Sequence, residues 1–150
     1  MLVDNSLLFI DMVGKSKEIQ KEKQVIIGNY YYDIKQRGLK IIGNTGRSGL
    51  LGDDPQLRHN SDRYIWVPTF NQLFNIFLKE IKKQYGTIAS DWSYKLFILE
   101  NLHYISMTAA NSNYTTIDTI NKALLLALHF EMYNKIWIDN AWVESQTKKI

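Results

Sequence analysis

The stretch Thr115–Tyr133 constrains the fold more than any other part of the chain. Read as a helix, it carries one apolar stripe with spacings of three and four residues: Ile117, Ile120, Leu124 and Leu128. From Ala123 to Leu128 the sequence is apolar on every side, so a helix here must be buried all round. Thr115 is the expected N-cap. We therefore expect the other elements to pack around this helix.

Size and composition favour one globular domain over residues 1–150. The chain has 150 residues, of which 45% are hydrophobic, and its formal net charge is only +3. It has no cysteine, which excludes a disulfide framework, a thiolate nucleophile and a cysteine-type zinc site. The longest apolar run is far shorter than the roughly 18–20 residues that span a bilayer. The N-terminus lacks the pattern of a signal peptide, so we expect no membrane partner and no export.

The N-terminal third predicts a helix followed by a small antiparallel sheet. Residues 5–23 read as one helix, capped by Asn5 or Ser6 and weakened in the middle by Gly14. Three segments then follow that are rich in β-branched and aromatic residues, and they predict two or three strands: Gln24–Ile27, Tyr30–Ile34 and Leu39–Ile42.

The rest of the chain predicts a loop, a short strand and a helical half. Gly43–Arg63 holds four of the eight glycines and no obvious element. Tyr64–Val67 reads as a strand, and residues 70–85 read as a helix that Gly86 ends. Residues 94–107 favour a helix over a strand, although their periodicity is mixed. A terminal hairpin should turn at Asp139–Asn140. The expected fold class is α+β, with a helical C-terminal half closed by a β-hairpin.

Several short motifs resemble a family of small uncharacterised phage and prophage proteins. The first is a tryptophan–apolar–proline–threonine entry to a helix at Trp66–Thr69, followed by Gln72–Leu73. The second is a Leu/Ala-rich helix that runs into an Asn-Lys-aliphatic-Trp turn at 134–137 and a Trp-Val strand at 142–143. The resemblance covers roughly residues 64–145. It implies an origin in a mobile element, and it carries no activity and no catalytic residue. With the lack of cysteine and of a signal-peptide pattern, we expect a cytoplasmic location in the host cell.

The loop holds the best candidates for catalysis. Its acidic and imidazole side chains lie within ten residues of one another: Asp53, Asp54, His59 and Asp62. Such groups bind divalent metals or act as general acids and bases, so a metal-dependent hydrolase or nuclease is one alternative. The glycines between 43 and 52 lack the endings of a phosphate-binding loop or a dinucleotide site. A surface loop is the simpler interpretation, and we expect no metal and no cofactor.

The histidines at 103 and 129 favour packing over chemistry. Both lie in predicted helices among apolar neighbours, and no HExxH motif is present. His129 and Glu131 are two residues apart, so a helix directs them to different faces. We interpret both histidines as packed or edge residues.

Aromatic residues supply the candidate binding residues. Tyr30 and Tyr32 lie near several basic side chains, and Arg47 lies in the glycine-rich loop. Rings on a strand can stack bases, so nucleic-acid binding is a second alternative. Trp137 and Trp142 fall on the terminal hairpin, where alternation can expose one ring, although packing against the central helix is the simpler interpretation. Our leading hypothesis is an accessory protein that binds another macromolecule, most simply a protein. Nucleic acid and a second copy of the chain remain open as partners.

Overall fold

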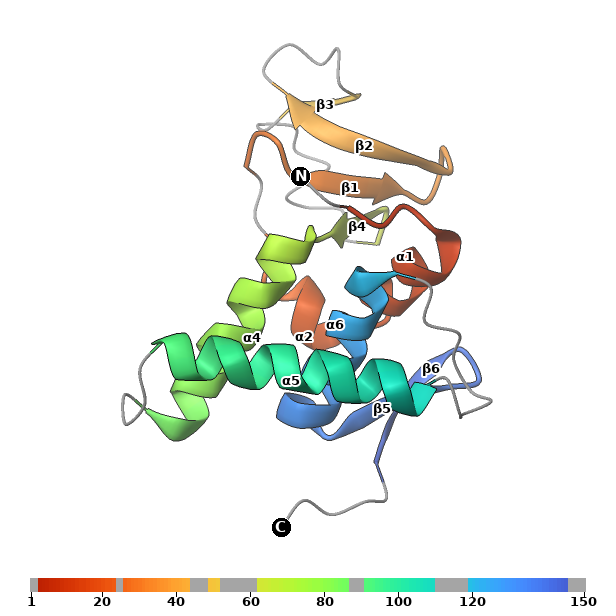
Figure 1. Ribbon diagram of the computed structural model, residues 1–150. Helices are drawn as coiled ribbons and strands as arrows, with labels where there is room; N and C mark the ends of the chain where they lie inside the picture. The colour runs from red at the N-terminus through yellow and green to blue at the C-terminus, as the bar shows by residue number, and fades with distance from the viewer. Residues whose placement is uncertain are drawn as a thin grey trace. The chain divides into compact units, whose positions relative to one another are not determined.

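The computed structural model describes residues 3–23, 26–43, 49–51, 62–86, 91–109 and 119–145. They form an α+β fold with small sheets and a C-terminal hairpin (Figure 1). The chain divides into two compact units, Val3–Thr69 and a second that contains Phe70–Ile150. A single domain over residues 1–150 stays a prediction.

The first unit begins with two short helices rather than one. α1 spans Leu7–Gly14, and α2 spans Lys17–Gln20. Ser6 caps α1, as expected, because its side chain accepts a hydrogen bond from Phe9 N. The prediction of one helix over 5–23 is wrong because Ser16 adopts an extended backbone and caps a new helix at Ile19 N.

A four-stranded sheet completes the first unit. Its strands are β1 (Tyr30–Asp33), β2 (Gly38–Gly43), β3 (Gly49–Leu51) and β4 (Tyr64–Val67), in the order β3-β2-β1-β4. β1 pairs antiparallel with β2 and β4, whereas β3 pairs parallel with β2. β3 lies inside the stretch that the sequence predicts as a loop. The predicted strand Gln24–Ile27 is wrong at Ile26 and Ile27, which lead into a turn at Gly28 with φ +94°; residues 24–25 lie outside the described residues.

The register separates the three tyrosines of β1. Tyr31 lies opposite Lys40 on β2 and Trp66 on β4. Tyr31 and Trp66 are buried together with Ile42, which shares their face of the sheet. Burial raises the pKa of Tyr31 to about 12. Tyr30 and Tyr32 point to the other face and are half-buried.

A side-chain amide protects the free edge of β4. Gln20 of α2 donates from Nε2 to the carbonyl oxygen of Trp66 at 2.9 Å. Its Oε1 accepts from the backbone N–H of Trp66 at 3.0 Å. The amide thus occupies the place that a neighbouring strand would take, which is one way to shield an edge strand from other chains.

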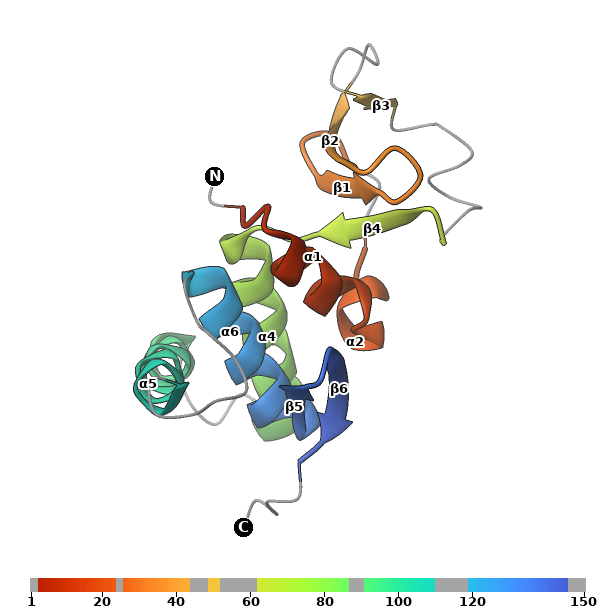
Figure 2. The same ribbon diagram turned by 90° about the vertical axis from the view of Figure 1, so that its right-hand side faces the viewer.

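In the described part of the second unit, three helices are followed by a π-helical segment and a hairpin. They are α4 (Phe70–Tyr85), α5 (Asp91–Ala109), α6 (Ile120–Leu128), η1 (His129–Tyr133), β5 (Lys135–Ile138) and β6 (Ala141–Glu144). α4 ends as predicted: Gly86 has φ +72°, and its N–H donates to the carbonyl oxygen of Lys82. In Figure 2, α5 is seen end-on, to one side of α4 and α6.

α6 is the central helix that the sequence predicts, but it is shorter. Every residue from Asn121 to Leu128 is buried, while Ile120 is exposed. Thr119, not Thr115, caps its first turn by accepting from Lys122 N; Thr115 lies outside the described residues. The helical path continues through η1 and ends at Asn134, which adopts the left-handed conformation.

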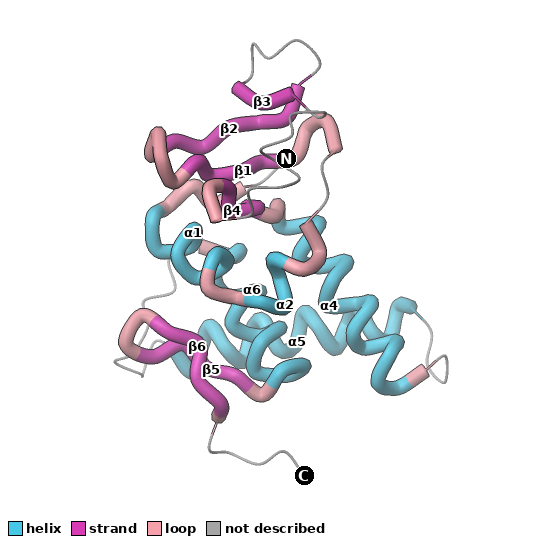
Figure 3. The backbone as a smooth tube through the Cα atoms, turned by 180° about the vertical axis from the view of Figure 1, so that it is seen from behind, coloured by secondary structure: helices cyan, strands magenta, loops and turns pink. Residues whose placement is uncertain are grey.

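The terminal hairpin forms as predicted, beside the end of the helical path (Figure 3). Asp139 and Asn140 have φ +52° and +62°, the signature of the tight turn that matches strand twist. Trp137 and Trp142 lie directly opposite each other across it. No helix among the described residues is long and apolar enough to cross a membrane.

Candidate interaction surface

The outer face of α5 carries large apolar side chains that nothing in the described structure buries. Trp92, Leu96 and Leu99 are 68%, 42% and 50% exposed, and His103 is also exposed. Their spacings of four, three and four residues place them on one side of the helix. We call these four residues the α5 stripe. Solvent-exposed apolar stripes of this kind are typical of surfaces that contact another molecule.

The opposite side of α5 fixes its orientation. Tyr94, Ile98 and Leu102 recur at spacings of four and are buried. The Tyr94 hydroxyl donates to the carbonyl oxygen of Gly86 at 2.6 Å. These contacts direct the α5 stripe outward.

An ion pair ties the start of α5 to the end of α4. Lys82 Nζ lies 2.8 Å from Asp91 Oδ1. The hydrogen bond from Lys82 lowers the pKa of Asp91, and the charges of Lys82 and Lys95 add to this effect. Asp91 also lies in the first turn of α5, where a carboxylate interacts favourably with the helix dipole.

The tyrosine strand offers a second, less exposed surface. Tyr30 and Tyr32 share a face with Leu39, Ile41, Ile65 and Val67, as the register dictates. All of these side chains are half-buried except Val67, which is fully buried. The two rings are therefore accessible only in part.

A buried carboxylate, Asp33, forms ion pairs with two basic side chains next to this strand. Asp33 is fully buried and lies within 3.1 Å of both Arg63 and Lys40. The Arg63 guanidinium, ahead of Lys40, holds the pKa of Asp33 well below its usual range. This cluster is satisfied within the unit and links the β1–β2 turn to the start of β4. No local sequence pattern indicates this cluster, because Asp33 and Arg63 are thirty residues apart.

The two hairpin tryptophans belong to an internal aromatic cluster. Trp137 is 3% exposed, so it is not a surface residue, and Trp142 is half-buried. The Trp142 ring stacks on His129 with centroids 3.8 Å apart and planes 11° apart. His129 is fully buried, and its Nδ1 lies 2.8 Å from the carbonyl oxygen of Leu125. His129 is thus a packed histidine, as the sequence predicts, whereas His103 is exposed at the helix surface.

The candidate catalytic residues of the loop lie mostly outside the described residues. Asp53, Asp54 and His59 lie outside the described residues, as does Arg47, and Asp62 is exposed. Within the described part of the chain, no three His, Asp or Glu side chains gather as metal ligands. The catalytic alternative stays a prediction.

Sequence reasoning missed the α5 stripe. A helix that buries one stripe and exposes another has apolar residues on both sides, so its periodicity looks mixed. The missing signal was the separate series 92, 96, 99 and 103, which runs beside the buried series 94, 98 and 102. Resolving the pattern into two series would have identified both faces.

No family model, curated protein or solved structure matches this chain. The resemblance to small phage proteins stays a prediction.

Proposed function

We propose that this chain is a phage-encoded accessory protein of the host cytoplasm that acts by binding another macromolecule through the α5 stripe. The observation that carries the proposal is the exposure of Trp92, Leu96 and Leu99 on one side of a helix whose other side is buried. A tryptophan near aliphatic side chains is typical of binding hot spots, because its ring buries a large area on contact. The phage origin rests on the resemblance over residues 64–145.

Photo-crosslinking from the stripe tests this proposal. A photoreactive amino acid replaces Leu96 in one variant and Leu7 in a control variant, since Leu7 is also an exposed leucine on a helix. We expect a discrete covalent adduct with another macromolecule from position 96 and none from position 7. Adding Leu99→Gln to the position-96 variant should reduce the adduct at least about fivefold, as loss of a buried anchor does. Equal labelling from both positions, or none from position 96, would refute the proposal.

The tyrosine strand supports a second candidate, nucleic-acid binding. Tyr30 and Tyr32 lie on one half-exposed face, and the adjoining turn exposes Lys35 and Arg37. Rings of this kind stack bases, and nearby cations contact phosphates. The test is binding of single-stranded DNA at low salt, by wild type and by Tyr30→Leu/Tyr32→Leu. A nucleic-acid binder must lose affinity as salt rises and in the double variant. If neither higher salt nor the double substitution weakens binding, this candidate function is wrong.

A further inference from the structure

We propose that the α5 stripe pairs with the same stripe of a second copy of this chain, with the two helices parallel. This inference rests on the proposed function only in taking the stripe as a binding surface. The charges beside the stripe favour a second copy of the chain as its partner.

The stripe has the spacing of a short coiled-coil seam. Trp92 and Leu99 take d positions, and Leu96 and His103 take a positions, over two heptads of α5. Identical helices can bury such seams against each other by inserting side chains between those of the partner. Nothing among the described residues buries the seam, since Trp92, Leu96 and Leu99 are all exposed. Figure 2 shows α5 to one side of α4 and α6.

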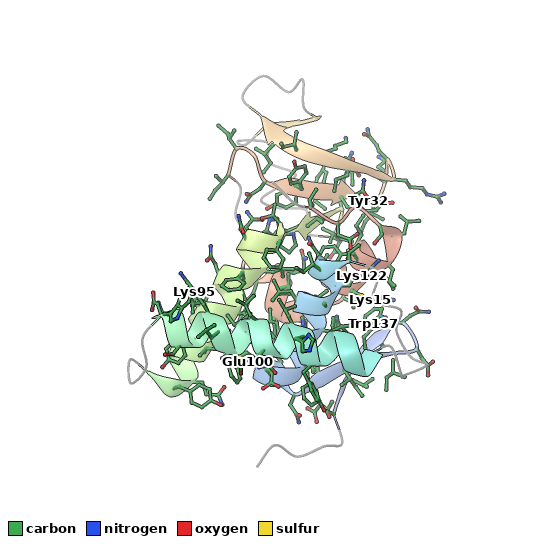
Figure 4. All side chains as sticks on the ribbon, viewed as in Figure 1. Lys15, Tyr32, Lys95, Glu100, Lys122 and Trp137 are labelled. Carbon is green, nitrogen blue, oxygen red and sulfur yellow. The ribbon has the colours of Figure 1, made fainter. Side chains whose placement is uncertain are left out.

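Two exposed charges flank the seam in a pattern that fits a parallel pair. Lys95 takes a g position and Glu100 the next e position, so they lie on opposite edges of the stripe (Figure 4). Five residues apart, they do not face each other within one helix. In a parallel pair, Lys95 of each copy lies across the seam from Glu100 of the other. In an antiparallel pair, Lys95 would instead lie on the same edge as Lys95 of the other copy, and Glu100 on the same edge as the other Glu100.

The exposed area predicts a weak dimer. Trp92, Leu96 and Leu99 together offer roughly 300 Å² per copy, given the areas that such side chains bury. Stable interfaces bury about 800 Å² per partner. We therefore expect association at protein concentrations on the order of 0.1 mM, measurable by sedimentation equilibrium.

Charge reversal tests the pairing. Lys95→Glu and Glu100→Lys each place like charges across the seam, so each variant alone should have a dissociation constant raised at least about fivefold. An equimolar mixture of the two single variants should associate at least as tightly as wild type, because every flanking pair is then attractive. Leu7→Gln is the control and should leave association unchanged. Failure of the mixture to recover association overturns the parallel pairing.

Disulfide trapping tests the orientation, since the chain contains no cysteine of its own. Leu99→Cys places two thiols side by side in a parallel pair, within reach of a disulfide, so oxidation should give a covalent dimer. Leu7→Cys should give far less. Equal cross-linking of the two variants overturns the proposal.

The two proposals fail in different ways. A wild type that stays monomeric up to about 1 mM, ten times the expected constant, overturns self-association. If position 96 still cross-links to a different macromolecule, the proposed function stands without self-association. If the chain dimerises through the stripe and no other adduct forms, self-association stands and binding of a different macromolecule fails.

Discussion

Arg63 donates two hydrogen bonds to the carboxylate of Asp33, from Nε to Oδ1 and from Nη2 to Oδ2, each at 3.1 Å. Asp33 also accepts from the backbone N–H groups of Lys35 and Gln36. The carboxylate therefore holds together the β1–β2 turn and the chain that enters β4. Its charge is compensated by Arg63 and Lys40, so burial is tolerated.

Removing this carboxylate should destabilise the first unit. We expect Asp33→Asn to lower the free energy of unfolding by about 3 kcal/mol at pH 7, because it leaves Arg63 and Lys40 without their counter-charge. Urea unfolding measures the difference. The control Asp62→Asn changes an exposed carboxylate and should alter stability by less than about 0.5 kcal/mol.

The same pair predicts a pH dependence. The folded-state pKa of Asp33 is lowered from its ordinary 3.8, so the stabilisation is complete above that value and is lost as the pH falls through the folded-state pKa. The stability gap between wild type and Asp33→Asn should therefore shrink steadily below about pH 4. A gap that stays constant from neutral pH to about pH 2.5 would contradict this assignment.

The amide of Gln20 should protect the edge of β4. Gln20→Ala leaves the N–H and carbonyl of Trp66 without this partner, so we expect a loss of about 2 kcal/mol in unfolding free energy. Hydrogen exchange of the Trp66 amide should quicken in the variant. Lys21→Ala, an exposed neighbour, serves as the control. Unchanged exchange at Trp66 would show that the amide does not protect the edge.

Gly86 should matter through its backbone conformation alone. Its φ of +72° is costly for residues with a Cβ, although the added Cβ would have no atom within 4 Å among the described residues outside its own turn of the chain. Gly86→Ala should therefore cost about 1 kcal/mol of unfolding free energy. Gly38→Ala also enters open space, but without a positive φ, and should be nearly neutral. Similar costs at both positions in thermal unfolding would refute this explanation.

The stacked pair of His129 and Trp142 should join the hairpin to the helical part of the second unit. Because the Leu125 carbonyl can only accept, His129 must carry its proton on Nδ1. His129→Ala removes both the stack and this hydrogen bond, so we expect about 3 kcal/mol of destabilisation. His129→Phe keeps a ring against Trp142 and should cost less. Val143→Ala is the control on the same strand. Equal losses in His129→Ala and Val143→Ala would argue against the stack.

The sequence predicts elements well where the pattern is local. Each of the following depends on a few neighbouring residues: the strands at 30–34, 39–42 and 64–67, the end of α4 at Gly86, and the hairpin turn at Asp139–Asn140. The break between α1 and α2 was missed because charged residues after Gly14 suit a helix. In the structure α1 ends at Gly14, and the cap at Ser16 starts a new helix.

Long-range features were not predictable in the same way. The Asp33–Arg63 pair and the Gln20–Trp66 contacts join residues 30 and 46 positions apart, and no local pattern indicates such partners. For the candidate surface, the sequence named Tyr30 and Tyr32 as binding residues, and the structure places both on one half-buried face. The burial of Tyr31 follows only from the register. The sequence predicted a helix at 94–107 but did not identify the α5 stripe, since that requires knowing which of two apolar series the unit buries.

The most direct test of the account is the stability of a stripe variant. If the stripe is a binding surface and not part of the core, Leu96→Gln/Leu99→Gln should keep its unfolding free energy within about 1 kcal/mol of wild type at micromolar concentration. The matched change Ile98→Gln, one residue away on the buried side, should lose at least about 3 kcal/mol. A stripe variant as unstable as Ile98→Gln would show that the chain itself covers the stripe, and would contradict the account.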